Sequence, residues 1–164
     1  MSICYTCGRK CQVVVKSGEL KMFIGQYGHN VDAKGRIILP AKFRDKLGDE
    51  IILARGLDGC LSAYSLEKWK DIEQKLSSLP TTKKQNRAYN RLVLSSAADL
   101  EFDKMGRINI PSHLIEIAGL KKKCIVVGVG DYFEIWDEER WSEYNSSIEE
   151  SFEDIAEDLV DFEM

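Results

Sequence analysis

The sequence predicts a mainly β fold with added helices, an α+β class, built from two pseudo-symmetric β-α-β repeats. Two observations lead to this prediction. A nine-residue motif occurs twice, and each copy is followed by a short helical pattern and then by an apolar run of β-forming residues. With 44% apolar and 30% charged residues, the composition suits a globular chain with a hydrophobic core.

The two copies of the motif are Asp32-Ala-Lys-Gly-Arg36-Ile-Ile-Leu-Pro40 and Asp103-Lys-Met-Gly-Arg107-Ile-Asn-Ile-Pro111, 71 residues apart. Asp, Gly, Arg, Ile and Pro recur at five of the nine positions. The correspondence continues downstream, where Phe43 matches Leu114 and Gly48 matches Gly119. Identities that stay in register across a motif and its downstream elements indicate an internal duplication.

Each motif predicts a turn between two strands. Asp-x-x-Gly favours a turn because glycine accepts a positive φ and aspartate can bond to its own backbone. We expect short strands at 37–39 and 108–110, each stopped by a proline that suits the first turn of a helix. Helices are expected at 41–47 and 112–118, with Gly48 and Gly119 as C-caps. The remaining strands are expected before each motif, around Tyr27–Val31 and Leu100–Phe102, and after each short helix, at 51–54, 60–64, 124–127 and 132–136.

Longer helices are expected after each repeat. Ser65 can cap a helix whose apolar stripe reaches Leu79 and which Pro80 ends. A second helical pattern covers 82–94 and contains four basic residues: Lys83, Lys84, Arg87 and Arg91. They either contact phosphate, form a solvated face, or pair with acidic groups of another subunit. Asp137 can cap the helix after the second repeat. Apolar residues at helical spacing in the tail predict a helix docked on its own chain or on a neighbour: Ile148, Phe152, Ile155 and Leu159.

The net charge of −4 hides an asymmetry along the chain. Residues 137–164 contain 12 Asp and Glu against Arg140 alone, a net charge of −11, and residues 1–136 have a net charge of +7. A polyanion responds to such a local field rather than to the total charge. The basic body is therefore compatible with nucleic-acid binding, and equally with an ordinary solvated surface. The acidic tail either pairs with a neighbour's basic surface, screens nonspecific DNA, or is solvated.

The sequence predicts a cytoplasmic protein. No run of eighteen apolar residues is present, and Val13–Val15 is too short for the core of a signal peptide. Disulfides are therefore not expected, and Cys60 and Cys124 are interpreted as small core residues. Cys4, Cys7 and Cys11 resemble part of a zinc site, but a fourth nearby ligand is missing, so we predict neither metal nor cofactor. Alternatively, translation starts at Met22, and residues 1–21 are not made.

From Met22 to about Tyr144 the sequence resembles the MraZ family, whose modules belong to the wider SpoVT/AbrB-like group. The resemblance rests on Met22-Phe-Ile-Gly25, Arg55-Gly-Leu-Asp58, Leu79-Pro80 and the two repeated motifs. It implies a double-split β-barrel in which the two repeats pair within one chain, and homo-oligomeric rings of chains. It also implies a nucleoid-associated regulator of transcription. Such a regulator acts on a promoter upstream of its own gene, in a division and cell-wall gene cluster, through short repeated sites in double-stranded DNA.

The resemblance assigns DNA contact to the Asp-x-x-x-Arg motif, which here is Asp32 with Arg36 and Asp103 with Arg107. Arginine fits guanine edges and phosphates bidentately, so we expect Arg36 and Arg107 to bind DNA. The residues expected to contact phosphate nearby are Lys34, Lys104, Lys42 and Arg44. A carboxylate would repel phosphate, which favours structural roles for Asp32, Gly35, Asp103 and Gly106. The alternative is a buried salt bridge in each motif that only holds the turn.

These interpretations divide the chain into five segments: an N-terminal extension at 1–21, a first repeat at 26–68, a helical linker at 69–96, a second repeat at 97–140 and an acidic C-terminal helix at 141–164. An enzyme is not expected. No phosphate-binding glycine loop or His-Glu zinc motif is present, and His29 and His113 occupy non-equivalent positions. The remaining alternative is a ring-forming protein-interaction scaffold that does not read DNA. Membrane and small-molecule partners are not expected.

Overall fold

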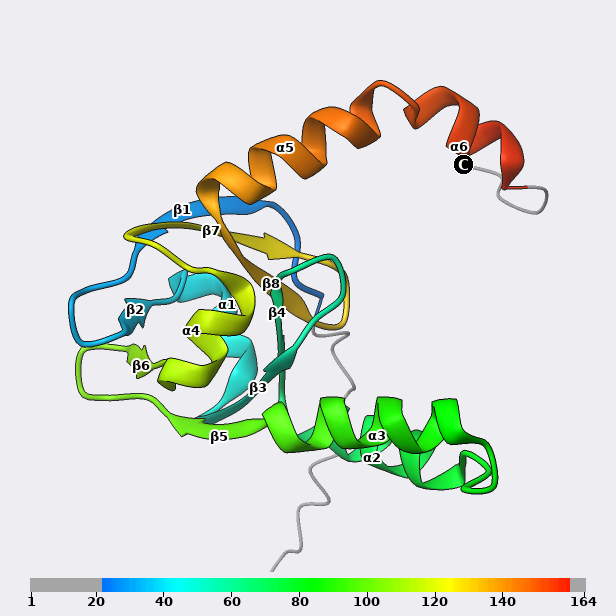
Figure 1. Ribbon diagram of the computed structural model, residues 1–164. Coiled ribbons are helices and arrows are strands. Elements are labelled where there is room, and N and C mark those ends of the chain that lie inside the picture. Colours follow the sequence, from blue (N-terminus) through cyan, green and yellow to red (C-terminus); the bar gives the residue numbers. More distant parts are fainter. Residues whose placement is uncertain (1–21, 160–164) are drawn as a thin grey trace, which may run out of the picture.

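The computed structural model describes residues 22–159, so the predicted N-terminal extension with Cys4, Cys7 and Cys11 lies outside the described residues. The elements follow one another along the chain in the order that Figure 1 shows: β1 (Gln26–Asn30), β2 (Arg36–Ile38), α1 (Ala41–Leu47), β3 (Glu50–Arg55), β4 (Leu61–Tyr64), α2 (Leu66–Ser78), α3 (Lys84–Ser96), β5 (Ala98–Glu101), β6 (Arg107–Asn109), α4 (Ser112–Ala118), β7 (Lys123–Gly128), β8 (Phe133–Asp137), α5 (Glu138–Glu149) and α6 (Phe152–Asp158). The predicted mixture of strands and helices is confirmed.

The strands form two antiparallel sheets in which the repeats interleave. One sheet has six strands in the order β1-β7-β8-β4-β3-β5, and the other is the two-stranded β2–β6 ribbon. Each strand has a counterpart in the other repeat: β1 and β5, β2 and β6, β3 and β7, β4 and β8. Exchanging the counterparts gives the same six-strand order, read from the opposite edge of the sheet. The fold therefore has an internal pseudo-twofold axis.

The strand registers locate this axis. Ile37 and Ile108 occupy the same motif position and pair with each other at the centre of the β2–β6 ribbon. In the large sheet, Ser62 and Glu134 are equivalent and pair with each other between β4 and β8. The axis thus passes through both sheets, and it relates Arg36 to Arg107 across the ribbon.

The main core lies between the ribbon and the large sheet. Ile37 and Ile108 are fully buried there, and Ile51 and Leu53 of β3 point into the same cluster. α1 adds Phe43, whose ring packs 5.1 Å from that of Phe23. The other face of β3 carries Ile52 and Ala54 and is covered by Trp69 and Ile72 of α2, Val93 of α3 and Ala97 directly after α3. The two faces follow from the alternation of side chains along a strand.

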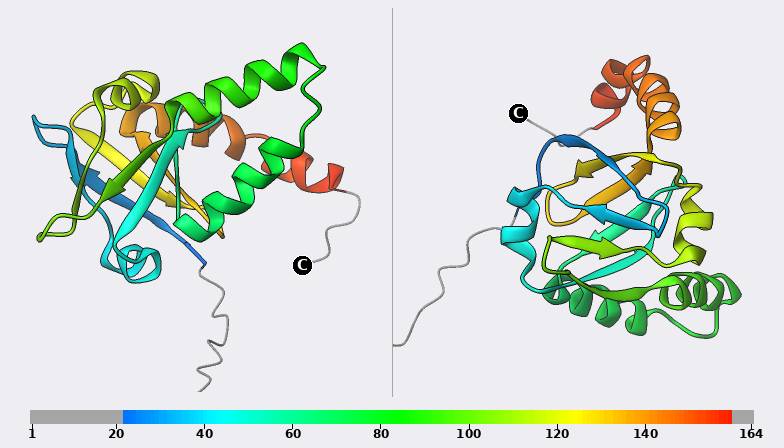
Figure 2. Two further views of the ribbon diagram at one scale, coloured as in Figure 1. Left: turned by 90° about the horizontal axis from the view of Figure 1, so that it is seen from below. Right: turned by 90° about the vertical axis from the view of Figure 1, so that its left-hand side faces the viewer.

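The barrel implied by the resemblance is not closed, because the large sheet is open. Its edges are β1 and β5, which lie at opposite ends of the strand order and do not pair. The Asp-x-x-Gly turn reverses the chain after each edge strand. β2 and β6 then pair with each other as a separate ribbon (Figure 2), and the only bridge from this ribbon back towards an edge strand joins Ile37 to Val31, next to β1.

The local signals for the helices agree with the structure at most boundaries. α1 and α4 have the predicted bounds, and the prolines stand immediately before them. Ser65 caps α2 by accepting from Lys68 N at 3.3 Å, and Asp137 caps α5 by accepting from Glu139 N at 3.2 Å. Gly119 adopts the left-handed C-cap conformation, whereas Gly48 has φ 85° and ψ −149° and makes no such cap.

The acidic tail differs from the single helix predicted at 141–164. α5 begins at Glu138 and ends at Glu149, and α6 follows as a separate helix. Between them Ser151 leaves the helical conformation, at φ −112° and ψ 8°, and its hydroxyl lies 3.3 Å from the Ser147 and Ile148 carbonyls. Serine competes in this way with the regular hydrogen bonds of a helix, which accounts for the break.

Cys60 and Cys124 are buried free thiols, as predicted for small core residues. Burial raises the pKa of both to about 12, so these thiols are protonated at neutral pH. Among residues 22–159, no helix has the length and apolar character that a membrane span requires.

The Ile37–Ile108 pair on the axis generates a stability prediction. Ile37→Ala removes a fully buried side chain and should lower the free energy of unfolding by about 2–5 kcal/mol. Ile38→Ala changes the next residue of the same strand, which is 45% exposed, and should cost no more than about 0.5 kcal/mol. Urea unfolding followed by circular dichroism measures both. Equal losses for the two variants would contradict the assignment of Ile37 to the core.

Candidate nucleic-acid interface

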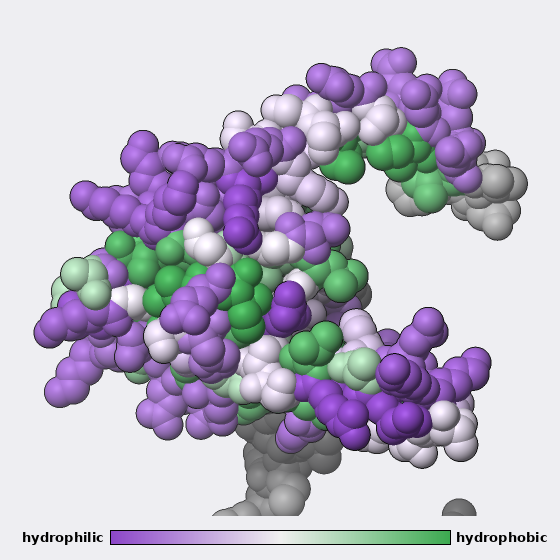
Figure 3. All heavy atoms as spheres, in the orientation of Figure 1, coloured by the Kyte–Doolittle hydropathy of each residue, from purple (hydrophilic) through white to green (hydrophobic). Residues whose placement is uncertain are grey.

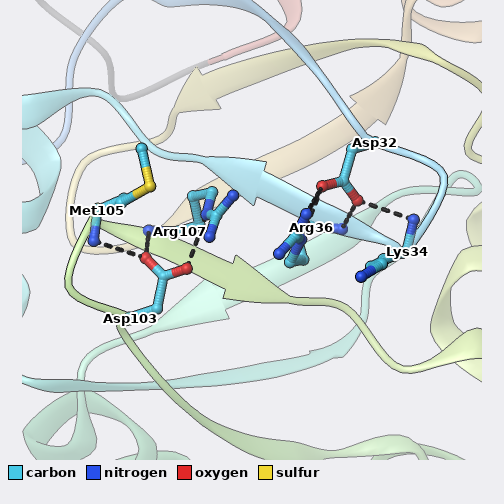
Figure 4. A network of polar contacts seen from close by, with 6 residues as sticks. All are labelled: Asp32, Lys34, Arg36, Asp103, Met105 and Arg107. Atoms are coloured by element: carbon cyan, nitrogen blue, oxygen red, sulfur yellow. Dashed lines mark hydrogen bonds and ion pairs between the residues drawn. The ribbon is translucent and has the colours of Figure 1, made fainter.

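The first motif forms a compact turn around the Asp32 carboxylate (Figure 4). Oδ1 accepts from the Lys34 backbone N–H at 2.9 Å and from the Arg36 backbone N–H at 3.0 Å. Oδ2 accepts from Arg36 Nε at 2.7 Å, and it also lies 2.7 Å from Arg36 Nη2 in the ion pair. Gly35 closes the turn at φ 77°, a conformation that favours glycine, and donates to the Asp32 carbonyl at 3.0 Å. One aspartate therefore shapes the turn and also fixes the arginine that follows it.

The second motif repeats this arrangement on the neighbouring strand. Asp103 Oδ1 accepts from the Met105 and Arg107 backbone N–H groups at 2.8 and 2.9 Å. Its Oδ2 accepts from Arg107 Nε at 2.7 Å. Gly106 has φ 73°, close to the value at Gly35. The pseudo-twofold axis thus places two arginines, each held by its own aspartate, on one antiparallel ribbon.

The arginine bonds shift the pKa values of both carboxyl groups. The hydrogen bond from the Arg36 side chain, together with the one from the Arg36 backbone N–H, lowers the pKa of Asp32 to about 2. The backbone N–H of Arg107 is the main cause of the lowered pKa of Asp103, and its side chain adds to the effect. Both aspartates are therefore ionised at neutral pH, and both ion pairs are fully formed.

Both ion pairs lie at the surface. The side chains of Arg36 and Arg107 are 32% and 24% exposed, and those of the two aspartates are 37% exposed. The structure therefore contains the salt bridges of the alternative interpretation, but they are not buried. Among residues 22–159, Arg36 Nη1 has no hydrogen-bond partner. Because Asp32 holds the Nε–Nη2 edge, the Nη1–Nη2 edge remains available to a ligand.

The ribbon presents four side chains on its outer face. Arg36 pairs with Asn109 and Ile38 pairs with Arg107, while Ile37 and Ile108 point to the core. Sequence reasoning singled out the two arginines and missed Ile38 and Asn109. The sequence does contain a signal for both, because side chains two residues apart on a strand point to the same face, and Ile38 and Asn109 each lie two residues after an arginine. The ribbon itself lies between α1 and α4 on one side of the molecule (Figure 2).

The other predicted phosphate contacts surround this ribbon. Lys34 and Lys104 are exposed within the two turns, and Lys42 is exposed on α1. Arg44 of α1 reaches across to the second motif, where its guanidinium fills the space that a Cβ on Gly106 would need. In the first motif the same place beside Gly35 is taken by Ile115 of α4. Each short helix thus supports the turn of the other repeat, and only one of the two supports is basic.

The histidines add no second site among the described residues, and the cysteine segment lies outside them. His113 Nε2 lies 3.2 Å from the Ser96 carbonyl, and partial burial lowers the pKa of His29. No group of three His, Cys, Asp or Glu residues suited to a metal ion is found within 22–159. Asp32 and Asp103 each accept a hydrogen bond from the arginine of their own motif.

Two successive stretches of the chain, residues 22–92 and 93–163, each match the family model described as "MraZ protein, putative antitoxin-like". The chain is also similar to the "Transcriptional regulator MraZ" of Ligilactobacillus salivarius (strain UCC118), with 53% identity over 143 residues. That similarity covers 87% of this chain and 100% of the relative. The boundary between the two family matches falls inside α3, after the first interleaved repeat.

The Asp32–Arg36 bond generates a pH prediction. A lowered pKa in the folded chain means that the ion pair stabilises the fold fully above the ordinary pKa of 3.8, and that this contribution is lost as the pH falls towards about 2. In Arg36→Ala the pKa of the Asp32 carboxyl should rise towards its ordinary value of 3.8, because the largest cause of the lowering is lost while the backbone N–H bonds from residues 34 and 36 remain. NMR titration of the side-chain carboxyl carbons measures this shift. Arg107→Ala is the matched control and should leave Asp32 unchanged, and an Asp32 midpoint near 3.8 in the wild type would refute the assigned bond.

Proposed function

The chain belongs to the MraZ family, and from this membership we propose that it is a sequence-specific DNA-binding regulator of transcription. The proposed target is the promoter of its own division and cell-wall gene cluster, read through short repeated sites. The name of the L. salivarius relative, a transcriptional regulator, supports the role. The same membership supports the prediction that the chain is not an enzyme, and a regulator of this kind works in the cytoplasm, at the nucleoid.

The observation that carries the proposal is the outer face of the β2–β6 ribbon. A two-stranded β-ribbon fits the major groove, where arginine pairs bidentately with guanine and asparagine with adenine. Arg36 and Asn109 are direct neighbours across the ribbon, and Arg107 lies at the symmetric position. In this proposal the two arginines read base edges, and Ile38 supplies an apolar contact such as a thymine methyl group accepts.

The aspartates preorganise the two arginines for this contact. An arginine side chain that is already fixed loses less conformational freedom when it binds. Asp32 holds one edge of Arg36 and leaves the other edge facing outward, so a ligand meets a guanidinium of fixed orientation. Lys34, Lys104, Lys42 and Arg44 then contact the phosphates on either side, which positions the ribbon without specifying sequence.

We further propose that each repeat is a SpoVT/AbrB-like module and that chains assemble into a ring. The interleaved strands and the pseudo-twofold axis support the first part, because a single repeat cannot complete the sheet. In the ring, several identical ribbons are presented together. Linked binding sites raise the effective concentration of each other, so closely spaced DNA repeats gain affinity without any new contact.

A ring-forming scaffold that does not read DNA is the second candidate. It is favoured by a groove of about 740 Å³ between α2, α3, α5 and the large sheet. The groove is lined largely by aromatic and aliphatic side chains, as is typical of a surface that binds protein. The two candidates differ in their response to salt, because binding to DNA releases counterions and weakens steeply as salt is added.

The role of the arginines is tested by fluorescence anisotropy of the full chain on DNA from upstream of its own gene, over a salt series. Arg36→Ala and Arg107→Ala should each lose about 1–3 kcal/mol of binding, roughly 5- to 150-fold in Kd, and should lose discrimination between sequences. Lys75→Ala removes one positive charge from α2, on a different face, and should bind nearly as the wild type does. A folded double variant that binds like the wild type would remove the ribbon from the mechanism.

The proposed assembly predicts a dependence on the number of DNA sites. An array of several copies of the bound element should be held at least tenfold more tightly than one copy, since one ring can engage several sites at once. The same anisotropy measurement on fragments with one, two and four copies tests this. Equal affinity per fragment, whatever the copy number, would show that each chain acts alone.

A further inference from the structure

The outer face of the β2–β6 ribbon is symmetric in its two arginines and asymmetric in its other two side chains. The pseudo-twofold axis exchanges Arg36 with Arg107, which occupy equivalent motif positions. The same rotation exchanges Ile38 with Asn109, so an apolar side chain on one strand corresponds to an amide on the other. The ribbon therefore has an amide end, where Asn109 lies opposite Arg36, and an apolar end, where Ile38 lies opposite Arg107.

Both differing side chains are available to a ligand. Ile38 is 45% exposed, and Asn109 is exposed as well. Among residues 22–159 the Asn109 side chain has no hydrogen-bond partner, and its Oδ1 lies 3.6 Å from the place that a Cβ on Gly35 would occupy. The left-hand side of Figure 3, where the ribbon and its turns lie, shows apolar residues between hydrophilic ones. The ribbon thus presents one free amide and one free apolar side chain.

The two ends also differ in charge. The Asp32 and Asp103 turns lie at opposite ends of the ribbon (Figure 4). At the second turn the Arg44 guanidinium packs against Gly106, whereas Ile115 takes the same place at the first turn. Arg44 Nε is buried there without a hydrogen-bond partner among the described residues. The apolar end therefore has an additional positive charge, and the amide end has additional hydrogen-bonding groups.

The symmetry of a DNA reader decides the symmetry of the sequence that it reads. A protein with a twofold axis recognises a palindromic element, because its two halves present the same groups to the two halves of the site. Arginine reads guanine in the same way at both ends of this ribbon. Asparagine pairs bidentately with adenine, whereas an apolar side chain packs against the methyl group of thymine. A ribbon with one of each therefore fits an element whose two halves differ.

We propose that Ile38 and Asn109 determine the specificity of the ribbon and set the orientation of the chain on its DNA. Asn109 selects an adenine beside the guanine that Arg36 reads. At the apolar end, Ile38 selects a thymine beside the guanine that Arg107 reads, and Arg44 binds a phosphate. A chain turned round on the same element would lose the bidentate contact of Asn109, which weakens binding by about 5- to 150-fold.

This inference rests on the proposed function and deepens it, because it requires the ribbon to read base edges. It adds a requirement that binding to DNA alone does not impose. The recognised element must be asymmetric, and positions 38 and 109 must be the cause. The two arginines by themselves would favour a palindrome, since the pseudo-twofold axis relates them.

The test uses two variants of the full chain that make the outer face of the ribbon symmetric. Ile38→Asn gives both strands the same amide, and Asn109→Ile gives both the same apolar side chain. The two positions are exposed, so both variants should keep the wild-type circular dichroism spectrum. A double variant, Ile38→Asn with Asn109→Ile, exchanges the side chains and restores the asymmetry. Ile24→Asn is the matched control, because Ile24 is 67% exposed and lies outside the ribbon.

Each protein selects its preferred sequence from a pool of random double-stranded DNA, and the bound DNA is sequenced. The wild type, the Ile24→Asn control and the double variant should select an asymmetric element. Ile38→Asn should select a palindrome with the adenine in both halves, and Asn109→Ile a palindrome with the thymine in both. In fluorescence anisotropy, Ile38→Asn should prefer its palindrome to the wild-type element by about 5- to 150-fold.

The outcomes separate this inference from the proposed function. A wild type that selects a palindrome would overturn the inference and leave sequence-specific DNA binding standing. Single variants that still select the asymmetric wild-type element would do the same, because the asymmetry would then arise elsewhere. A wild type that enriches no sequence from the pool would remove the proposed function, and the inference with it.

Discussion

All backbone hydrogen bonds that β1 makes in the large sheet go to β7 of the other repeat, and β5 pairs only with β3. β2 pairs with β6 along its whole length, and within its own repeat it has only the isolated bridge between Ile37 and Val31. An unpaired strand edge in a buried sheet is costly, because each peptide group loses its bonds to water. Neither repeat can therefore satisfy its own strands, and the two must fold together. This exchange of strands creates the pseudo-twofold axis, the shared core between the sheets and the ribbon at the surface.

The same axis determines what the surface presents. It brings the two arginine motifs, which are far apart in the sequence, onto adjacent strands at positions related by the pseudo-twofold rotation. The Asp–Arg pairs themselves are exposed, and exposed ion pairs contribute little to stability. Their contribution is geometric, since each carboxylate binds two backbone N–H groups and one edge of a guanidinium at once. The core residues Ile37 and Ile108 beneath them fix the height and tilt of the ribbon.

Local features were the part of this structure that sequence could predict. The turns at Gly35 and Gly106, the short helices after Pro40 and Pro111, and the caps at Ser65 and Asp137 depend on residues within a few positions of each other. Pairing between strands depends on residues far apart, and the open sheet therefore could not be derived from the repeat alone. Arg44 illustrates the limit for the site: its place beside Gly106 follows from the strand exchange and not from its own neighbours. At Ser151 the helix is broken because the serine hydroxyl competes for the carbonyl groups of the preceding turn. The apolar stripe from Ile148 to Leu159 instead predicts one continuous helix.

Two linked repeats in one chain have an evolutionary consequence. In an assembly of two identical single-repeat subunits, any inherited change appears in both halves at once, and a change that harms either half is lost. Here a change alters one half and leaves the other as it was. The halves have already diverged: Lys34 corresponds to Met105, Ile38 to Asn109 and Arg44 to Ile115, while the framework of Asp, Gly, Arg and Pro is the same in both. Duplication has thus separated what the scaffold must preserve from what each half is free to acquire.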